Sequence, residues 1–395
     1  METIKWAVNH MPKTEDANLP VMALSEVEKA RTFHESFPQY SVTPLVKLNH
    51  MAEKLGLGSL YIKDESYRFG LNAFKVLGGS FAMARYIAQQ TGKDVSELPY
   101  NILTSEALKK EFGQATFFTA TDGNHGRGVA WAANKLGQKA VVLMPKGSTQ
   151  TRLNNIRKEG ATATIEECNY DECVRMAADM AARTEHGIIV QDTAWDGYEE
   201  IPAWIMQGYG TMAMEADDQL HEDGCEAPTH VFIQAGVGSL AGAVQGYFAN
   251  RYPKTPPKVV VVEAEAAACL YKGAAAGDGA IRIVDGDMPT IMAGLACGEP
   301  NTISWDILKN HVDTFVAAKG MRMLAAPIKG DTPVTSGESG AAPFGTLACI
   351  MCMDEYQELR EHLGLDETSR VLLFSTEGDT DPTRYESIVW DGNER

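Results

Sequence analysis

The chain has 395 residues, of which 44% are hydrophobic and 22% are charged, a composition typical of globular proteins. A chain of this length predicts about two domains. Its formal net charge of -18 argues against binding to nucleic acid or to an anionic membrane, because both would repel it.

The N-terminus has no basic stretch followed by an apolar segment, and no apolar run approaches the length of a membrane span. We therefore expect a cytoplasmic protein. The seven cysteines are an odd number in a long chain and do not form the pattern of a disulfide framework. No metal is expected, since the C-x-x-C at Cys349 and Cys352 lies in apolar surroundings without a second pair.

Residues 1–40 are polar and irregular apart from one predicted helix, and we expect them to form a surface arm. The elements predicted after this arm are, in order, a strand at 41–48, a short helix, a strand at 59–66, a helix from about 74 to 92, and a mixture of helix and loop at 93–114.

From residue 116 the pattern alternates between strand and helix. Predicted strands lie at 116–120, 140–145, 162–167 and 188–193, with helices at 125–137, 150–160 and 170–187 between them. A long helix at about 201–221 leads to a second series, with strands at 229–236, 258–265 and 371–378 and a helix at 238–252.

Such alternation predicts parallel sheets covered by helices on both faces. We expect two doubly wound α/β domains with mostly parallel sheets. The large domain would comprise residues 1–88 and 202–395, and the small α/β domain, residues 89–201, would be inserted in it.

Lys75 lies in the segment SYRFGLNAFKVLGGS, residues 66–80. It follows Phe74 and precedes Val76, so its ammonium is expected in apolar surroundings that lower its pKa. A neutral lysine can form a Schiff base with a carbonyl cofactor, and Gly78 and Gly79 would leave room for a flat group near the backbone. The ordinary alternative is a lysine whose stem packs on apolar residues while its ammonium reaches water.

Ligands of open α/β sheets bind beyond the carboxyl ends of strands, and the loop TDGNHGRG, residues 121–128, has that position. The loop opens a helix, so its amides, with Asn124 and His125, could hold a carboxylate or a ring hydroxyl. Asp122 has an alternative role as the helix N-cap.

A second loop, QAGVGSLAG at 234–242, also joins a strand to a helix. Gly236 and Gly238 allow successive N–H groups to converge on a phosphate, with Ser239 adding a hydroxyl. The loop could instead be a dinucleotide-binding fingerprint, with Glu263 or Glu265 as the ribose acceptor, although its spacing departs from G-x-G-x-x-G.

Two further turns follow predicted strands. Ser375 and Thr376 enter the turn STEGDTD, where a hydroxyl could bond a ring nitrogen or serve as an ordinary Ser/Thr turn. Asp192 follows the strand IIVQ and could be either a functional carboxylate or a cap.

Together these motifs resemble the fold-type II pyridoxal phosphate enzymes, the group that includes tryptophan synthase β, threonine dehydratase and serine racemase. The shared features, in chain order, are Thr43-Pro44-Leu45, the lysine of NAFK, GNHG, GVG and STEGD. More narrowly, the chain is similar to the diaminopropionate ammonia-lyase family from about residue 40 to 390, in KDESYRFGLNAFKVLGG, TDGNHGRGVAWAA, QDTAWDGY, PAWIMQGYGT, IMAGLACGEPN, SGESGA and STEGDTD.

The resemblance implies that pyridoxal 5'-phosphate is the cofactor and that Lys75 forms a Schiff base with it. Asn124 would bond its phenolic oxygen, Gly294 would lie near its ring, and Ser375 would meet its pyridine nitrogen. The phosphate would be held by Gly236, Val237, Gly238, Ser239 and Leu240.

The resemblance also implies that Thr121, Asn124 and His125 hold the substrate carboxylate. Asp122 departs from the serine and threonine dehydratases, which have Ser or Thr there. A carboxylate opposite Lys75 would be a second general base, so that Lys75 takes the α-proton of the L-isomer and Asp122 that of the D-isomer.

Asp192 is the candidate to hold the β-ammonium of the substrate. The implied reaction is an α,β-elimination that converts D- or L-2,3-diaminopropionate to pyruvate and two ammonia, catalysed by a homodimer. The alternatives are a serine or threonine dehydratase of the same fold, and a nucleotide- or NAD-binding protein.

Overall fold

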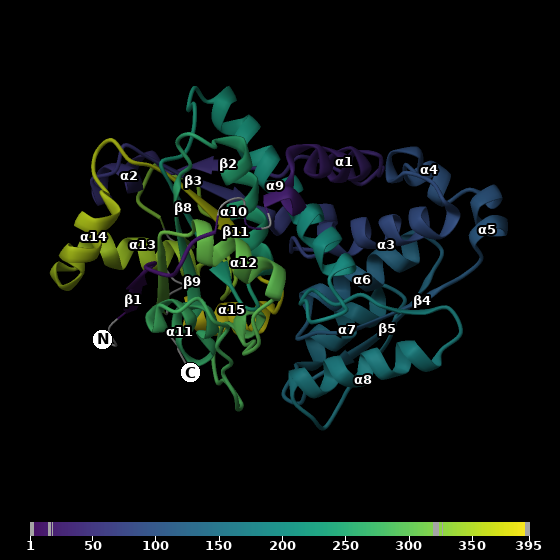
Figure 1. Cartoon of the computed structure of the whole chain (residues 1–395). Coiled ribbons are helices and arrows are strands. Elements are labelled where there is room, and N and C mark those ends of the chain that lie inside the picture. Colours follow the sequence, from purple (N-terminus) through teal and green to yellow (C-terminus); the bar gives the residue numbers. More distant parts are fainter. Residues whose placement is uncertain (1–3, 15–16, 18, 319–323, 326, 392–395) are drawn as a thin grey trace. The chain divides into compact units, whose positions relative to one another are not determined.

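The structure, a computed structural model, describes residues 4–14, 17, 19–318, 324–325 and 327–391. The chain forms two compact units (Figure 1). Unit 1 consists of Met1–Ala23, Val42–Tyr67 and Met212–Arg395, and unit 2 of Leu24–Ser41 and Arg68–Thr211. This division assigns residues 24–41 and 68–88 to unit 2, whereas the predicted domain boundaries, which stay a prediction, put both segments in the large domain.

Unit 1 is built on a seven-stranded sheet, counted over the described residues. Its strands are, in spatial order, β1 (Lys5–Val8), β10 (Thr314–Ala318), β9 (Lys258–Ala264), β8 (His230–Ala235), β11 (Arg370–Ser375), β3 (Ser59–Asp64) and β2 (Leu45–Lys47). Neighbours pair in parallel except at the two edges, where β1 and β2 are antiparallel to their partners.

The helices of unit 1 bury this sheet. Every residue of β8 is buried, and both α10 and α13 pack against that strand. Such two-sided cover explains the unbroken apolar runs of β9 and β11. The helices are α2 (Asn49–Leu55), α10 (Ser239–Arg251), α11 (Cys269–Ala276), α12 (Thr302–His311), α13 (Ala342–Cys352), α14 (Gln357–Leu363) and α15 (Pro382–Val389).

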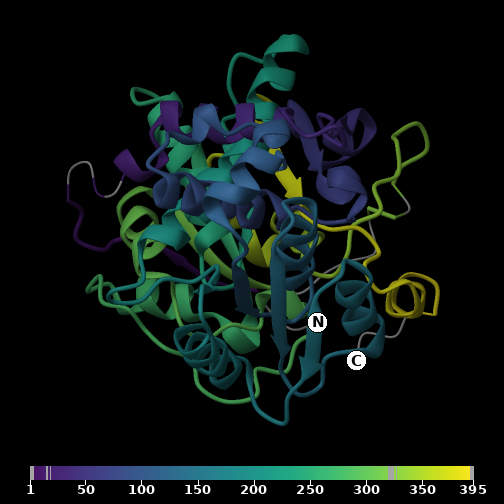
Figure 2. The ribbon, with the colours of Figure 1, turned by 90° about the vertical axis from the view of Figure 1, so that its right-hand side faces the viewer.

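Unit 2 holds a four-stranded parallel sheet within its described residues, in the order β6 (Thr162–Ile165), β5 (Lys139–Met144), β4 (Thr116–Ala120), β7 (Gly187–Ile189). Helix α6 packs on β4 and β5, α7 on β6, and α8 on β4, β5 and β7 (Figure 2). The helices are α1 (Leu24–Glu35), α3 (Val76–Thr91), α4 (Tyr100–Leu103), α5 (Glu106–Phe112), α6 (Asn124–Lys135), α7 (Gln150–Lys158) and α8 (Tyr170–Arg183), and α9 (Glu200–Glu222) continues from unit 2 into unit 1.

The turn before Lys75 has an unusual backbone. Phe69, Gly70 and Asn72 have φ values of 51°, 71° and 60°, in the left-handed region, and α3 then begins at Val76. The turn predicted at Gly70 and Asn72 is therefore present, and it delivers Lys75 to the N-terminal end of a helix.

The expectation that Gly78 and Gly79 leave room for a flat group is wrong. A Cβ at Gly78 would lie 2.6 Å from side-chain atoms of both Ile205 and Tyr209, and one at Gly79 would lie 3.3 Å from Val129. These glycines instead allow other helices to pack closely on α3.

Strand β1 corrects the expectation of an irregular surface arm at residues 1–40, because it extends the large sheet by pairing Lys5 to Val8 with β10.

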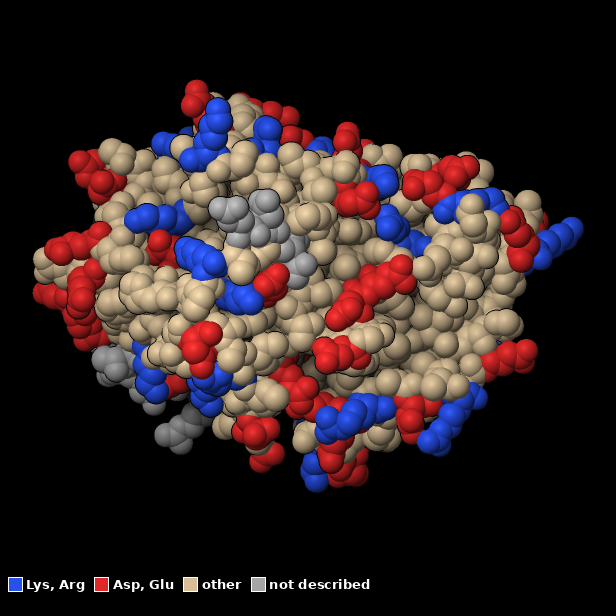
Figure 3. Space-filling model, viewed as in Figure 1, with Lys and Arg blue, Asp and Glu red and all other residues tan. Residues whose placement is uncertain are grey.

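Within the described part of the chain, none of the helices has the length and apolar character that a membrane span requires. On the face of the molecule in Figure 3, Lys and Arg are interspersed with Asp and Glu.

Candidate active site

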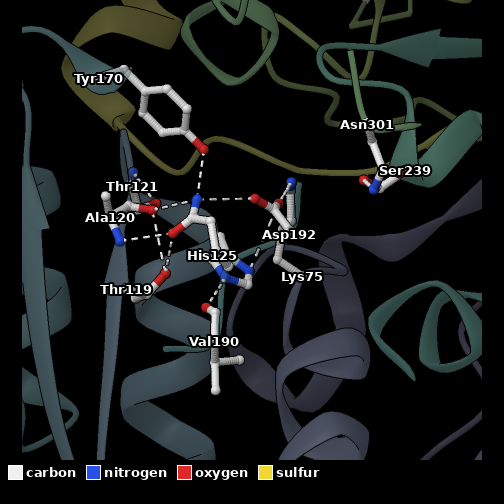
Figure 4. A network of polar contacts seen from close by, with 12 residues as sticks. Lys75, Thr119, Ala120, Thr121, His125, Tyr170, Val190, Asp192, Ser239 and Asn301 are labelled. Carbon is white, nitrogen blue, oxygen red and sulfur yellow. Dashed lines mark hydrogen bonds and ion pairs between the residues drawn. The ribbon is translucent and has the colours of Figure 1, made fainter. Parts of the chain in front are cut away.

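Two predicted site residues of unit 2, Lys75 and His125, meet a third, Asp192 (Figure 4). Lys75 is the N-cap residue of α3, and its ammonium forms an ion pair with Oδ2 of Asp192. His125, in the first turn of α6, places its Nδ1 3.8 Å from the same oxygen. The side chain of Asp192 is 5% exposed and that of Lys75 23%, so the pair is largely shielded from water.

This ion pair overturns the expected pKa of Lys75. Burial lowers the pKa of Lys75, but the charge of Asp192 and the phenol of Tyr209 outweigh burial and raise it. The residues beside Lys75 in the sequence are apolar as predicted, yet the group that meets its ammonium lies 117 positions away.

The same contacts set the protonation of Asp192. Burial raises its pKa, whereas the charges of His125 and Lys75 lower it, and the result is a pKa of about 2. Burial also lowers the pKa of His125 below its ordinary value, so the ring is neutral at pH 7. Asp192 is therefore ionised at neutral pH beside the ammonium of Lys75.

His125 is held in one tautomer. Its Nε2 lies 2.9 Å from the carbonyl oxygen of Val190, and because a carbonyl only accepts, Nε2 carries the hydrogen. Nδ1 is then an acceptor, and it is buried without a hydrogen-bond partner among the described residues.

The loop of Thr121, Asp122 and Asn124 joins β4 to α6. The Thr121 hydroxyl accepts a bond of 2.9 Å from the N–H of Gly123. Gly123 is the N-cap of α6 and makes no side-chain cap bond, so the alternative role of Asp122 as the N-cap is wrong. Instead, Oδ2 of Asp122 lies 3.2 Å from Nη1 of Arg152, a partner that the local sequence did not indicate.

The predicted phosphate loop lies in unit 1, between β8 and α10. Gly238, with φ of 102°, is the N-cap of α10 and provides no side-chain cap. The first N–H groups of this helix thus suit an anion. Gly236 is close to another predicted residue, because a Cβ there would lie 3.2 Å from the carbonyl oxygen of Gly294.

Asn301 supports this loop, a role that was not predicted from the sequence. Its backbone N–H donates to the carbonyl of Val237 at 2.8 Å, and its Nδ2 donates to the Ser239 hydroxyl at 2.9 Å (Figure 4). Asn301 is also the N-cap of α12, where its side chain accepts from the N–H of Ser304. The sequence did contain a signal, because Asn301 ends IMAGLACGEPN, one of the segments that carry the family resemblance.

Ser375 ends β11 as predicted. It is fully buried, and its hydroxyl lies 2.8 Å from that of Ser336. Thr376 follows it and accepts a hydrogen bond from Nε2 of Gln234. A neutral hydroxyl therefore lies at the carboxyl end of this parallel strand.

Glu263 does not have the role that a dinucleotide site requires. Its two carboxylate oxygens accept bonds from the N–H groups of Leu270 at 2.9 Å and Tyr271 at 2.6 Å, at the start of α11. Burial raises its pKa to about 8. Glu263 is 1% exposed, and its carboxyl group is already bonded to the protein's own N–H groups, so it is not available to a ribose.

Residues 37–347 match the family described as pyridoxal-phosphate dependent enzyme. The chain belongs to this family, and its cofactor is pyridoxal phosphate. The described residues fit that group, because Lys75 stands at a helix start beside an ionised carboxylate and the uncapped N-terminus of α10 suits a phosphate.

Within the family, the chain is similar to the diaminopropionate ammonia-lyase of Salmonella typhimurium, with 54% identity over 367 residues, 91% of each chain. It is 47% identical to that of Escherichia coli K12 over 381 residues, 94% of this chain and 93% of the relative. The crystal structure of the Escherichia coli enzyme in complex with D-serine superposes with a TM-score of 0.91 and 43% identity over 99% of this chain and 98% of the other. The predicted α/β fold with mostly parallel sheets is thereby confirmed.

Proposed function

We infer that this chain is a carbon–nitrogen lyase that converts 2,3-diaminopropionate, in its D- and L-forms, to pyruvate and two molecules of ammonia. The observation that carries this inference is the 54% identity to a diaminopropionate ammonia-lyase over 91% of both chains. Pyridoxal phosphate, when bound, supplies the electron sink for the negative charge that develops at the α-carbon.

We propose that Lys75 carries the cofactor. Asn124 contacts its phenolic oxygen, Gly294 its ring and Ser375 its pyridine nitrogen. The phosphate is bound by Gly236, Val237, Gly238, Ser239 and Leu240. Support for this division comes from the uncapped start of α10 and from the buried hydroxyl of Ser375.

The substrate carboxylate is proposed to bind at the start of α6, through Thr121, Asn124 and His125. A helix N-terminus attracts anions, and its N-cap, Gly123, makes no side-chain cap bond. The His125 ring already donates to Val190, so His125 contributes its backbone N–H to the carboxylate.

Lys75 and Asp122 are proposed as the two bases for the α-proton, Lys75 for the L-isomer and Asp122 for the D-isomer. Asp192 is proposed to hold the β-ammonium, because it is ionised and already accepts an ammonium group, that of Lys75. With the substrate's ammonium at Asp192, the amine of Lys75 has no ion-pair partner there, which lowers the pKa of Lys75 and makes it a base.

The proposed activity is tested by its products. The purified protein is incubated with DL-2,3-diaminopropionate, and pyruvate and ammonia are measured together with the visible spectrum. We expect two ammonia for each pyruvate, and an absorption band that borohydride removes while it fixes the cofactor to Lys75. One ammonia per pyruvate from serine, with no turnover of diaminopropionate, would instead indicate a dehydratase.

Asp192→Asn tests the β-ammonium site. An amide cannot pair with an ammonium as a carboxylate does, and hydrogen bonds to charged groups contribute about 1.5–3 kcal/mol. We therefore expect kcat/KM for diaminopropionate to fall by at least about tenfold more than kcat/KM for D-serine. Equal losses on the two substrates would mean that Asp192 does not recognise the leaving group.

A homodimer in the cytoplasm is also proposed, on the basis of the family resemblance. Sedimentation of the purified protein and fractionation of cells that express it are the corresponding measurements.

A further inference from the structure

Gln191 continues the hydrogen bonding between β4 and β7 beyond the point where the strands separate. The parallel ladder runs from Thr116 and Gly187 to Phe118 and Ile189, and the N–H of Val190 still donates to the carbonyl of Phe118 at 2.8 Å. The next groups of β4 are the N–H and C=O of Ala120. Both bond to the side-chain amide of Gln191 and not to its backbone, at 3.0 and 3.1 Å.

The amide of Gln191 thus replaces a peptide group. It has one acceptor and one donor side by side, as a peptide does. Its oxygen also accepts from the Thr119 hydroxyl at 3.0 Å, and its nitrogen donates to the Tyr170 hydroxyl at 2.7 Å. The side chain is fully buried, so these bonds are made away from water.

Because the side chain of Gln191 bonds to Ala120 in place of the backbone, the main-chain groups on both sides of Gln191 can bond to other partners. The carbonyl of Val190 accepts from His125 Nε2 at 2.9 Å (Figure 4). The next residue, Asp192, turns to meet the ammonium of Lys75. The N–H of Gln191 itself donates to the Tyr198 hydroxyl at 2.7 Å, which holds the diverging backbone.

We propose that Gln191 is a positioning residue that directs Asp192 to its ammonium partner and keeps His125 in its Nε2–H tautomer. It does so by bonding to the N–H and C=O of Ala120, which the backbone after Val190 would otherwise have to bond. The effect of Gln191 on turnover, its catalytic consequence, rests on the proposed function. Its effect on the contact between Lys75 and Asp192, the positional consequence, does not.

The positional consequence is measured on the full-length protein before cofactor is added, by competitive acetylation of Lys75 at pH 8. Asp192 keeps Lys75 protonated and unreactive, so its displacement exposes the neutral amine. We expect Gln191→Met, which keeps the length but removes the amide, to raise the acetylation rate of Lys75 about tenfold, the effect of one pKa unit. Asp192→Asn provides the reference for a fully lost partner.

The matched control is Gln138→Met. Gln138 also uses its amide to serve β4, accepting from the N–H of Ala115 at 2.7 Å and donating to the carbonyl of Leu136 at 3.2 Å. It lies at the opposite end of that strand from the site loop. We expect the Gln138→Met variant to have the same rate of Lys75 acetylation and the same turnover as the unmodified protein.

The catalytic consequence is measured on the holoenzyme in a double-mutant cycle. Gln191→Met should lower kcat by about tenfold, since small displacements of reacting groups are costly. In an Asp192→Asn background the further loss should be below about threefold, because Gln191 acts through Asp192. A purely structural residue would instead give additive losses.

The inference is overturned if Gln191→Met folds and leaves Lys75 acetylation unchanged, or if its loss of kcat is fully additive with that of Asp192→Asn. Should this variant not fold, Gln191→Asn takes its place, because its amide is one methylene shorter and does not reach Ala120, while it places no charge beside Asp192. Absence of pyruvate from the unmodified enzyme would overturn the proposed function only, since the acetylation test needs no substrate.

Discussion

Lys75→Ala is expected to reduce turnover of both isomers by at least about 10³-fold, because it removes a nucleophile and, for the L-isomer, a general base that alone contributes about 10²–10⁴-fold. It should also remove the absorption band that borohydride fixes to the protein. The measurements are pyruvate release with saturating cofactor and mass spectrometry of the peptide that contains residue 75 after reduction.

Lys75→Arg separates the chemistry of Lys75 from its charge. A guanidinium keeps a cation beside Asp192 but does not form a Schiff base with the cofactor. We expect this variant to melt within a few degrees of the unmodified protein while it remains inactive, whereas Lys75→Ala leaves Asp192 without its cation and should melt lower. Lys135→Ala, in the neighbouring helix α6, is the control and should retain full activity. Turnover of Lys75→Arg above a tenth of the normal rate would contradict the assignment.

Asp122→Asn is expected to lose turnover of D-2,3-diaminopropionate by at least about 10²-fold, the lower end for a general base, while the L-isomer stays within about threefold. The amide has the same shape as the carboxylate but accepts no proton. Initial rates with each pure isomer provide the measurement.

Arg152→Met is the companion to this variant. Arg152 contacts both Oδ2 of Asp122, at 3.2 Å, and its carbonyl oxygen, at 3.4 Å, so the substitution loosens the carboxylate without removing it. We expect a smaller loss on the D-isomer than with Asp122→Asn. If Asp122→Asn lost turnover of both isomers equally, the assignment of Lys75 to the L-isomer and Asp122 to the D-isomer would be contradicted.

Much of the fold could be predicted because its central strands carry their own signal. The strand predicted at 116–120 has the bounds of β4, and those at 140–145 and 371–378 correspond to β5 and β11. Strands buried on both faces are unbroken apolar runs, which the sequence displays directly. Strand β1 has four residues at a sheet edge, and only its partner β10, some 300 positions later, makes it a strand.

The candidate site was predictable where a loop has its own composition, as in the glycines before α10. It was not predictable where partners come from distant segments. The pairing of Asp192 with Lys75 and of Asp122 with Arg152 depends on how four elements of unit 2 pack together. Gln191 opens QDTAWDGY, one of the segments that carry the family resemblance, but nothing in that segment indicates that its side chain bonds to the backbone of Ala120.

The order in which the chain supplies the two units has a consequence for synthesis. All four strands of the sheet in unit 2 lie between residues 116 and 189, so that sheet can form soon after those residues leave the ribosome. Strand β3 is made long before β11, its parallel partner and the last strand of the sheet. At about 5–20 residues per second, the early strands of unit 1 wait about 15–60 s with an open edge. Aggregation during expression should therefore originate in the unfinished large sheet, and slower growth at lower temperature should relieve it.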